Sequence, residues 1–213
     1  FWGDSISAPI QLINNSDINY LTLDYLAEVT LSIMQKQKNK NKEFGFAHDF
    51  INLIDEKIND ILDKKIKIIT NASGVNPTKC SQIIKEIAKN NNKEIKIAIV
   101  EGDDITSEIN TKINKNISFN NMDTGESIDV IKNSICSANV YIDSFAISEA
   151  LSLGADIVLC GRVSDPGLSL GPMIYEFGWG KTDYNKLASG TLAGHIIECG
   201  AQCTGGNHTN WKN

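Results

Sequence analysis

The sequence predicts an α/β protein with a mostly parallel sheet and helices on both faces, and we expect it to be truncated at both ends. Four short runs rich in Ile, Val and Leu have the length and branching of buried strands. Stretches of ten or more residues with helical periodicity separate these runs, an alternation that is typical of βαβ units. Glycine or polar residues follow each run, as is usual where open α/β sheets bind ligands.

The clearest strand ends at Cys160, because the apolar run breaks at Gly161 and leads into a polar turn that contains Arg162. Asp165 is expected to cap the following helix, since Pro166 suits the first helical position. The four expected strands are Tyr20–Leu23, Lys67–Thr70, residues 95–100 and residues 156–160.

Helices are expected where apolar residues recur at helical spacing. Gly171 and Pro172 predict a kink, or a break into two short helices, and Gly190 and Gly194 are expected to loosen the last helix. Residues 105–140, rich in Asn and Ser, predict loops, one helix and a short strand pair. The expected helices are one that reaches Ile13 and those at residues 25–34, 46–62, 77–87, 144–153, 166–177 and 184–199.

Two carboxylates near the start of the expected helix 25–34 have two interpretations. Asp24 lies one turn before Glu28, so both would lie on one helical face. Asp24 could cap the helix, while the negative charge of Glu28 interacts favourably with the positive N-terminal end of the helix dipole. Alternatively the two could form a functional pair, because burying an unpaired carboxylate is unfavourable.

Composition limits the possible functions. The net charge of −6 argues against a nucleic-acid surface, and no apolar run approaches the roughly 20 residues that span a bilayer. Five cysteines without a CxxC pair, and no signal peptide, favour free thiols in the cytoplasm. We therefore expect residues 1–213 to form a single incomplete domain that binds a small molecule and has no nucleic-acid or membrane partner. The domain could form a homo-oligomer. The sequence identifies no cofactor.

Polar turns after three expected strands indicate one shared site. In a parallel sheet with right-handed crossovers these turns lie at the same edge. Arg162 could bind an anionic group with two parallel hydrogen bonds, or it could form an internal salt bridge to Asp165 or to the acidic cluster of residues 101–104. The candidate binding residues in these turns are Asn71, Gly74, Glu101, Gly102, Asp103, Gly161 and Arg162.

Two groups of residues have the residue types of metal ligands, and both also have simpler interpretations. Glu101, Asp103 and Asp104 could hold Mg²⁺ or recognise hydroxyl groups, but they are equally typical of an acidic loop. His195 and Cys199 lie one helical turn apart, as zinc ligands often do, with Cys203 and His208 further on. Cysteines are often core residues, and the later turn has no predictable direction, so no metal site is expected.

Taken together, these turns resemble the N-terminal domain of the acyclic terpene utilisation family (AtuA-like proteins). The resembling motifs are FWGD at Phe1, DYLAEVT from Asp24, the turn at residues 71–77, VEGDD from Val100, GADIVLCGRVSDPGLSLGP from Gly154, EFGW from Glu176 and GTLAGHIIECGAQCTGGN from Gly190. Ser73, His208 and Asn210 depart from the residues expected of the family. The TGGN motif adds Gly205, Gly206 and Asn207 to the candidate binding residues.

The resemblance implies a role in bacterial pathways that degrade citronellol and geraniol through branched acyl-CoA intermediates. We expect a domain that binds or transforms a branched acyl-CoA or carboxylate, with Arg162 on the anionic group. The alternative is a non-catalytic binding or assembly subunit. The candidates for proton transfer are Asp24, Glu28, Asp104, Asp165 and His195.

Overall fold

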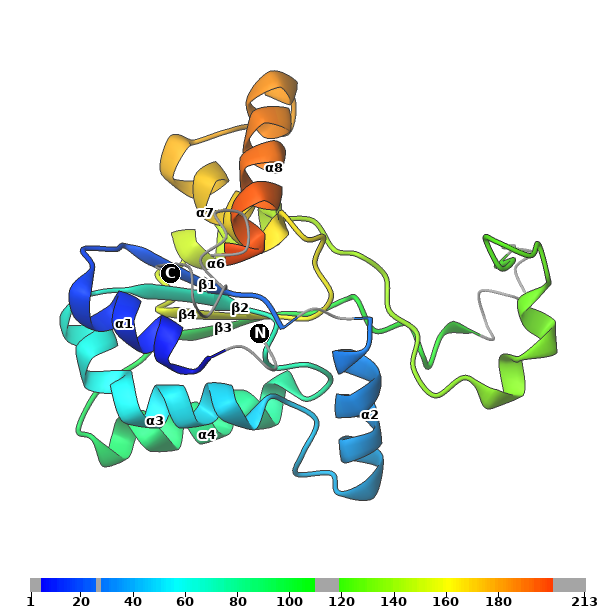
Figure 1. Cartoon of the computed structure of the whole chain (residues 1–213), viewed down its shortest axis with the longest axis horizontal. Helices are drawn as coiled ribbons and strands as arrows, with labels where there is room; N and C mark the ends of the chain where they lie inside the picture. The colour runs from blue at the N-terminus through cyan, green and yellow to red at the C-terminus, as the bar shows by residue number, and fades with distance from the viewer. Residues whose placement is uncertain (1–4, 26–27, 110–118, 201–213) are drawn as a thin grey trace, which may run out of the picture.

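The computed structural model describes residues 5–25, 28–109 and 119–200, and within them four parallel strands form one sheet. The sheet order is β1-β2-β4-β3 (Figure 1). Thr22, Ile69, Val158 and Ala98 lie side by side in one row across it. The strands are β1 (Tyr20–Leu23), β2 (Lys67–Thr70), β3 (Ile97–Val100) and β4 (Ile157–Cys160).

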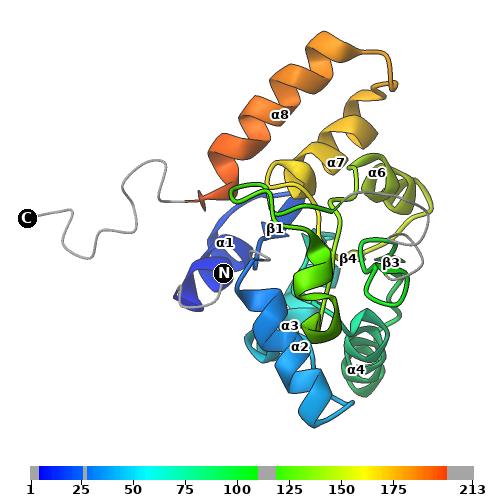
Figure 2. The ribbon, with the colours of Figure 1, turned by 90° about the vertical axis from the view of Figure 1, so that its right-hand side faces the viewer.

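Helices cover both faces of this sheet, which confirms the predicted fold class. Helices α1, α3 and α4 pack on one face, while α6 and α7 pack on the other, and Figure 2 shows α8 lying against α7. The helices are α1 (Ser7–Asn15), α2 (Thr30–Lys40), α3 (His48–Asp63), α4 (Pro77–Asn90), α6 (Phe145–Ser152), α7 (Gly167–Phe177) and α8 (Tyr184–Glu198). None of the described helices is long and apolar enough to cross a membrane.

The alternation of side chains along each strand divides the core into two layers. Ile68 of β2 and Leu159 of β4 pack with α3 and α4, whereas Ile69 and Val158 pack with α6 and α7. All four residues of β4 are buried, so both faces of this central strand are covered. This explains why the strand is a continuous apolar run.

Helix α2 corrects the prediction for residues 25–34, because it begins only at Thr30 and continues to Lys40. The backbone N–H of Tyr25 donates to Asn71 Oδ1 at 2.6 Å, so the chain leaves β1 without entering a helix. Leu31 and Met34 of α2 are buried, whereas Val29 and Ile33 are exposed. Asp24 accepts a hydrogen bond from Asn71 and is not the helix cap.

Helices α7 and α8 differ from expectation in two respects. Helix α7 is continuous through Pro172, and Asp165 does not cap it, since its carboxylate faces Arg162 and His195. Gly190 and Gly194 do not loosen α8 but allow it to pack closely. A Cβ at Gly194 would lie 2.8 Å from the Pro166 carbonyl, and one at Gly190 would lie 2.6 Å from the Trp179 ring.

The segment between β3 and α6 returns to the sheet after two short 3₁₀ helices, η1 (Ile128–Val130) and η2 (Lys132–Ser134). It pairs with residues that follow both neighbouring strands: Asn139 pairs with Asp104, and Ile142 pairs with Val163. The predicted strand pair is reduced to isolated bridges among the described residues. This return brings residues 138–142 to the carboxyl ends of β3 and β4.

The position of a ligand site follows from the connections of β2 and β4. These strands are neighbours, yet β2 leads to α4 on one face and β4 leads to α7 on the other. Chains that leave adjacent strands in opposite directions open a crevice at the carboxyl edge. Asn71 follows β2 and Arg162 follows β4, so both lie at this edge of the sheet.

Candidate functional site

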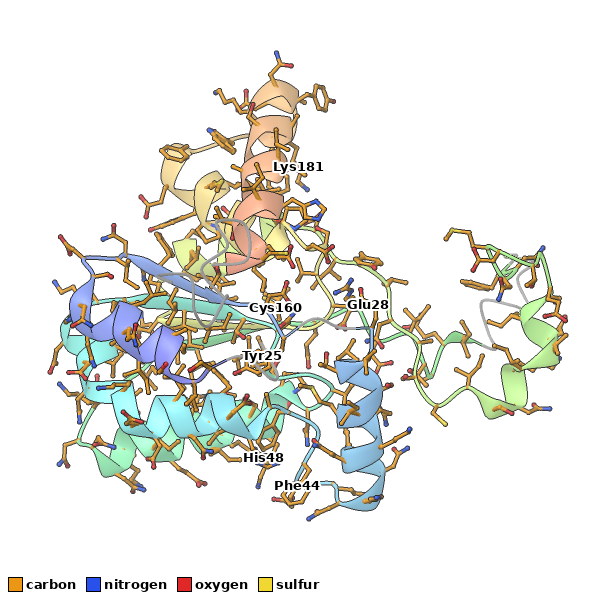
Figure 3. All side chains as sticks on the ribbon, viewed as in Figure 1. Tyr25, Glu28, Phe44, His48, Cys160 and Lys181 are labelled. Atoms are coloured by element: carbon orange, nitrogen blue, oxygen red, sulfur yellow. The ribbon has the colours of Figure 1, made fainter. Side chains whose placement is uncertain are left out.

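The carboxyl edge of the sheet gathers polar residues that follow all four strands. Asp24 follows β1, Asn71 follows β2, Asp103 follows β3 and Arg162 follows β4, and hydrogen bonds tie them into two groups. Figure 3 shows Tyr25, Glu28 and Cys160 at this same end of the sheet. The shared edge expected from the sequence is therefore present.

Arg162 is the centre of the first group. Its side chain is only 5% exposed, and its Nη2 donates to Glu28 Oε1 at 2.6 Å and to the Tyr141 hydroxyl at 2.9 Å. Asp165 Oδ1 is 3.4 Å from the same nitrogen. Within the described part of the chain, Nε and Nη1 donate no hydrogen bond. The guanidinium thus keeps unused donors although the side chain is buried.

Two further features stabilise the positive charge of Arg162. Its Cζ lies 4.3 Å from the centroid of the Tyr141 ring, a cation–π contact. Burial opposes the charge, but the Tyr141 hydrogen bond and the carboxylates of Glu28 and Asp165 outweigh it and raise the pKa of Arg162. The arginine is therefore charged wherever the protein is folded.

Asp103 fixes the backbone from which Arg162 extends. Its buried carboxylate accepts the Arg162 N–H at 2.7 Å and Asn139 Nδ2 at 2.8 Å, both at Oδ2. A Cβ at Gly161 would overlap this carboxylate, so only glycine allows the approach. Burial, together with the charge of Asp103, raises the pKa of the neighbouring Cys160 thiol, so that thiol stays protonated.

Asn71 joins the ends of β1 and β2. Its Nδ2 donates to Asp24 Oδ1 at 2.7 Å while its Oδ1 accepts the Tyr25 N–H. Ser73, in the same turn, donates from its hydroxyl to the Cys160 carbonyl at 3.0 Å and so connects β2 to β4. These bonds connect the carboxyl ends of β1, β2 and β4, and Asn71 itself is buried.

The C-terminal end of α8 adds His195 and Glu198 to the Arg162 side of the edge. His195 Nε2 lies 3.7 Å from Asp165 Oδ2, and both side chains are partly exposed. Burial is the main cause that raises the pKa of Glu198; a hydrogen bond with Cys199 opposes it, the charges of Asp24 and Asp165 add to it, and His195 opposes it least. Glu198 thus lies near the carboxylates of Asp24 and Asp165 and is held unfavourably in its charged form.

The acidic turn after β3 lines a separate pocket of about 320 Å³. Glu101 and Asp104 are exposed on this side, and neither forms an ion pair with Arg162 in the described structure. Asp103 and Gly161 border the pocket, so they form the wall between it and Arg162. The pocket is lined by Lys38, Gly74, Val75, Asn76, Pro77, Thr78, Val100, Glu101, Gly102, Asp103, Asp104, Asn139 and Gly161.

Three predicted site residues, Gly205, Gly206 and Asn207, lie outside the described residues, as do Cys203 and His208 of the zinc-like pattern. In residues 5–25, 28–109 and 119–200, no group of three or more His, Cys, Asp or Glu side chains could hold a metal ion. Cys80, Cys136 and Cys160 are free thiols there.

The sequence prediction missed Asn139, Tyr141 and Glu198. Asn139 lies in the Asn- and Ser-rich segment 105–140, Tyr141 follows directly after it, and Glu198 is brought to the site only by the packing of α8. One sequence signal would have strengthened the choice of Arg162. It is the only arginine in the chain, which otherwise uses 19 lysines for positive charge.

The fold and the site together define an open, parallel α/β domain with a cluster of buried polar residues at the carboxyl edge of its sheet. The family model described as "Acyclic terpene utilisation family protein AtuA" matches residues 1–213. The chain therefore belongs to the acyclic terpene utilisation family AtuA, as the sequence motifs indicated. Searches of curated proteins and of solved structures each found no match.

Proposed function

We propose that this domain binds the anionic group of a branched, acyclic terpenoid acid or of its CoA thioester at the carboxyl edge of the sheet. Membership of the family supports the terpenoid part of the proposal. The observation that carries the anionic part is the buried guanidinium of Arg162, whose Nε and Nη1 donate no hydrogen bond within the described residues.

An arginine suits this role better than a lysine would. Its planar fork offers parallel donors to a carboxylate or phosphate, and it keeps its charge when buried. Every other cation in the chain is a lysine, so the fork is present only at this edge. The hydrogen bond from Arg162 N–H to Asp103 fixes the direction in which the fork extends.

We propose binding rather than a defined reaction because the groups that could move a proton are only partly assembled. His195 lies 3.7 Å from Asp165 Oδ2, beyond hydrogen-bonding distance, and its side chain is 60% exposed. Catalytic contacts often shorten when a ligand binds, so His195 with Asp165 is the pair that a bound ligand would bring together. Turnover is therefore measured in the same experiment as binding.

The test uses the full protein with three related probes: citronellate, its CoA thioester and citronellol, which lacks a carboxylate. We expect the acid or the thioester to bind at least tenfold more tightly than citronellol in isothermal titration calorimetry. Mass spectrometry of the equilibrated mixtures then separates the two roles. Unchanged ligand supports a binding subunit, and a new product assigns an enzyme. Equal affinity for all three probes would contradict the proposal.

A further inference from the structure

The hydrogen bonds of Arg162 restrict how an anion could reach it. A guanidinium has two donor pairs that match a carboxylate, Nε with Nη2 and Nη1 with Nη2. Nη2 belongs to both pairs. It is also the nitrogen that donates to Glu28 and Tyr141, with Asp165 at 3.4 Å. While these contacts persist, an external carboxylate can make only single hydrogen bonds to Nε or Nη1.

Glu28 is the partner best placed to leave. Its side chain is 62% exposed, against 37% for that of Asp165, so its released carboxylate is readily hydrated. Asp165 lies three residues from Arg162 in the turn that leads into α7. Glu28 instead comes from the distant turn before α2, and its contact with Nη2 at 2.6 Å is the shortest that Arg162 makes.

We infer that Glu28 is a built-in competitor for the ligand: its carboxylate occupies Arg162 Nη2 in the free protein, and a ligand carboxylate must displace it to bind with two hydrogen bonds. This inference rests on the proposed function for the identity of the ligand. The occupation of Nη2 itself can be tested without any ligand. Exchange of one carboxylate for another leaves the charge of the crevice unchanged, because the acid of Glu28 moves into water as the ligand enters.

The ligand-free test uses the fact that Arg162 is the only arginine in this sequence. Phenylglyoxal modifies guanidinium groups, and peptide mass spectrometry gives the rate at Arg162. Glu28→Gln removes the charged competitor with little change in shape. The matched control is Glu43→Gln, since Glu43 has the same 62% exposure and pairs with Lys79 on the surface.

We expect Arg162 to react about three- to tenfold faster in the Glu28→Gln protein than in the wild type, and at the wild-type rate in Glu43→Gln. Equal rates in the two variants would overturn the inference. Circular dichroism of the wild type, Glu28→Gln and Glu43→Gln shows whether the comparison is between folded states. Glu28→Asp shortens the side chain but keeps the charge, so it gives an intermediate rate if contact with Nη2 limits the reaction.

Binding of citronellate separates this inference from the proposed function. If both hold, Glu28→Gln binds citronellate about three- to tenfold more tightly than the wild type, and citronellate slows the modification of Arg162. If Arg162 is modified faster in Glu28→Gln but neither citronellate nor its thioester protects it, the role of Glu28 as a competitor stands and the proposed ligand is contradicted. If citronellate protects Arg162 but binds the wild type and Glu28→Gln with equal affinity, the proposed ligand stands and the role of Glu28 as a competitor is contradicted.

Discussion

Asp103 Oδ2 accepts the backbone N–H of Arg162 at 2.7 Å, so the turn after β3 fixes the backbone of the residue that follows β4. The same oxygen accepts Asn139 Nδ2. The carboxylate reaches this position because Gly161 has no side chain. The arginine is thus held from its backbone by one acid, and its guanidinium is contacted by two others, Glu28 and Asp165.

This relationship predicts a severe effect of Gly161→Ala. The added Cβ would overlap the Asp103 carboxylate and force it away from the Arg162 N–H, so we expect the free energy of unfolding to fall by about 2–3 kcal/mol. Chemical denaturation measures this change. Gly180→Ala is the control, because a Cβ there would meet only Asp183 Oδ2 at 3.9 Å, an ordinary contact.

A double-mutant cycle identifies the cause. Asp103→Ala alone leaves the Arg162 N–H and the Asn139 amide without their acceptor, which we expect to cost about 1–3 kcal/mol. In that background Gly161→Ala meets no carboxylate, so its own cost becomes much smaller. If the two losses simply add, the overlap with Asp103 is not what requires glycine at position 161.

Much of the fold could be predicted because local patterns and tertiary packing agree. Strand β2 has the predicted bounds, and the run before Gly161 forms the fully buried strand β4. Pro77 begins α4 and Gly178, with φ 60°, ends α7, as their backbone preferences indicate. These features depend on residues close in sequence, which is why a single sequence reveals them.

The failures occurred where a distant partner takes a group that local rules had assigned. Asn71 accepts the Tyr25 N–H and donates to Asp24, so Asp24 cannot cap a helix there. Arg162 and His195 lie close to the carboxylate of Asp165, which leaves α7 without a side-chain cap. The ion pair between Arg162 and Asp165 was one of the alternatives open from the sequence. The contacts of Arg162 with Glu28 and Tyr141 were missed, because these residues are distant in sequence and no local pattern contains them.

Glu198 predicts a specific dependence of stability on pH. Its pKa is raised in the folded protein, mainly by burial, with a hydrogen bond from Cys199 opposing the shift and the charges of Asp24 and Asp165 adding to it. The unfolded chain therefore loses this proton at lower pH, and its contribution to stability falls as pH rises from the usual value of a glutamate through the folded pKa. Glu198→Gln cannot ionise, so it does not lose stability in this way as the pH rises.

We expect Glu198→Gln to be more stable than the wild type at neutral pH, by less than about 1 kcal/mol because water screens a partly exposed group. The advantage should shrink as pH falls below about 4, where the wild-type carboxyl is protonated in both states. Urea denaturation of both proteins across this range measures it. Parallel pH profiles for the two proteins would contradict the assignment.

The described cysteines are expected to differ in reactivity. Cys136 and Cys199 are exposed, whereas Cys80 and Cys160 are buried, and burial raises the pKa of Cys80 to about 12. A maleimide reagent should therefore label Cys136 within minutes in the native protein and reach Cys80 and Cys160 only after unfolding. Peptide mapping gives the order of labelling. Early labelling of Cys160 would show that β4 is more accessible than the structure indicates.

Arg162→Lys tests the central claim most directly. Lysine keeps the charge but loses the planar fork, so affinity for whichever anionic terpenoid binds the wild type, citronellate or its thioester, should fall by about 1–3 kcal/mol, roughly five- to 150-fold. The measurement is the dissociation constant of that ligand for the wild type and the variant by isothermal titration calorimetry, with equal unfolding midpoints as evidence that both are folded. The account predicts weaker binding to the variant, and equal dissociation constants would contradict it.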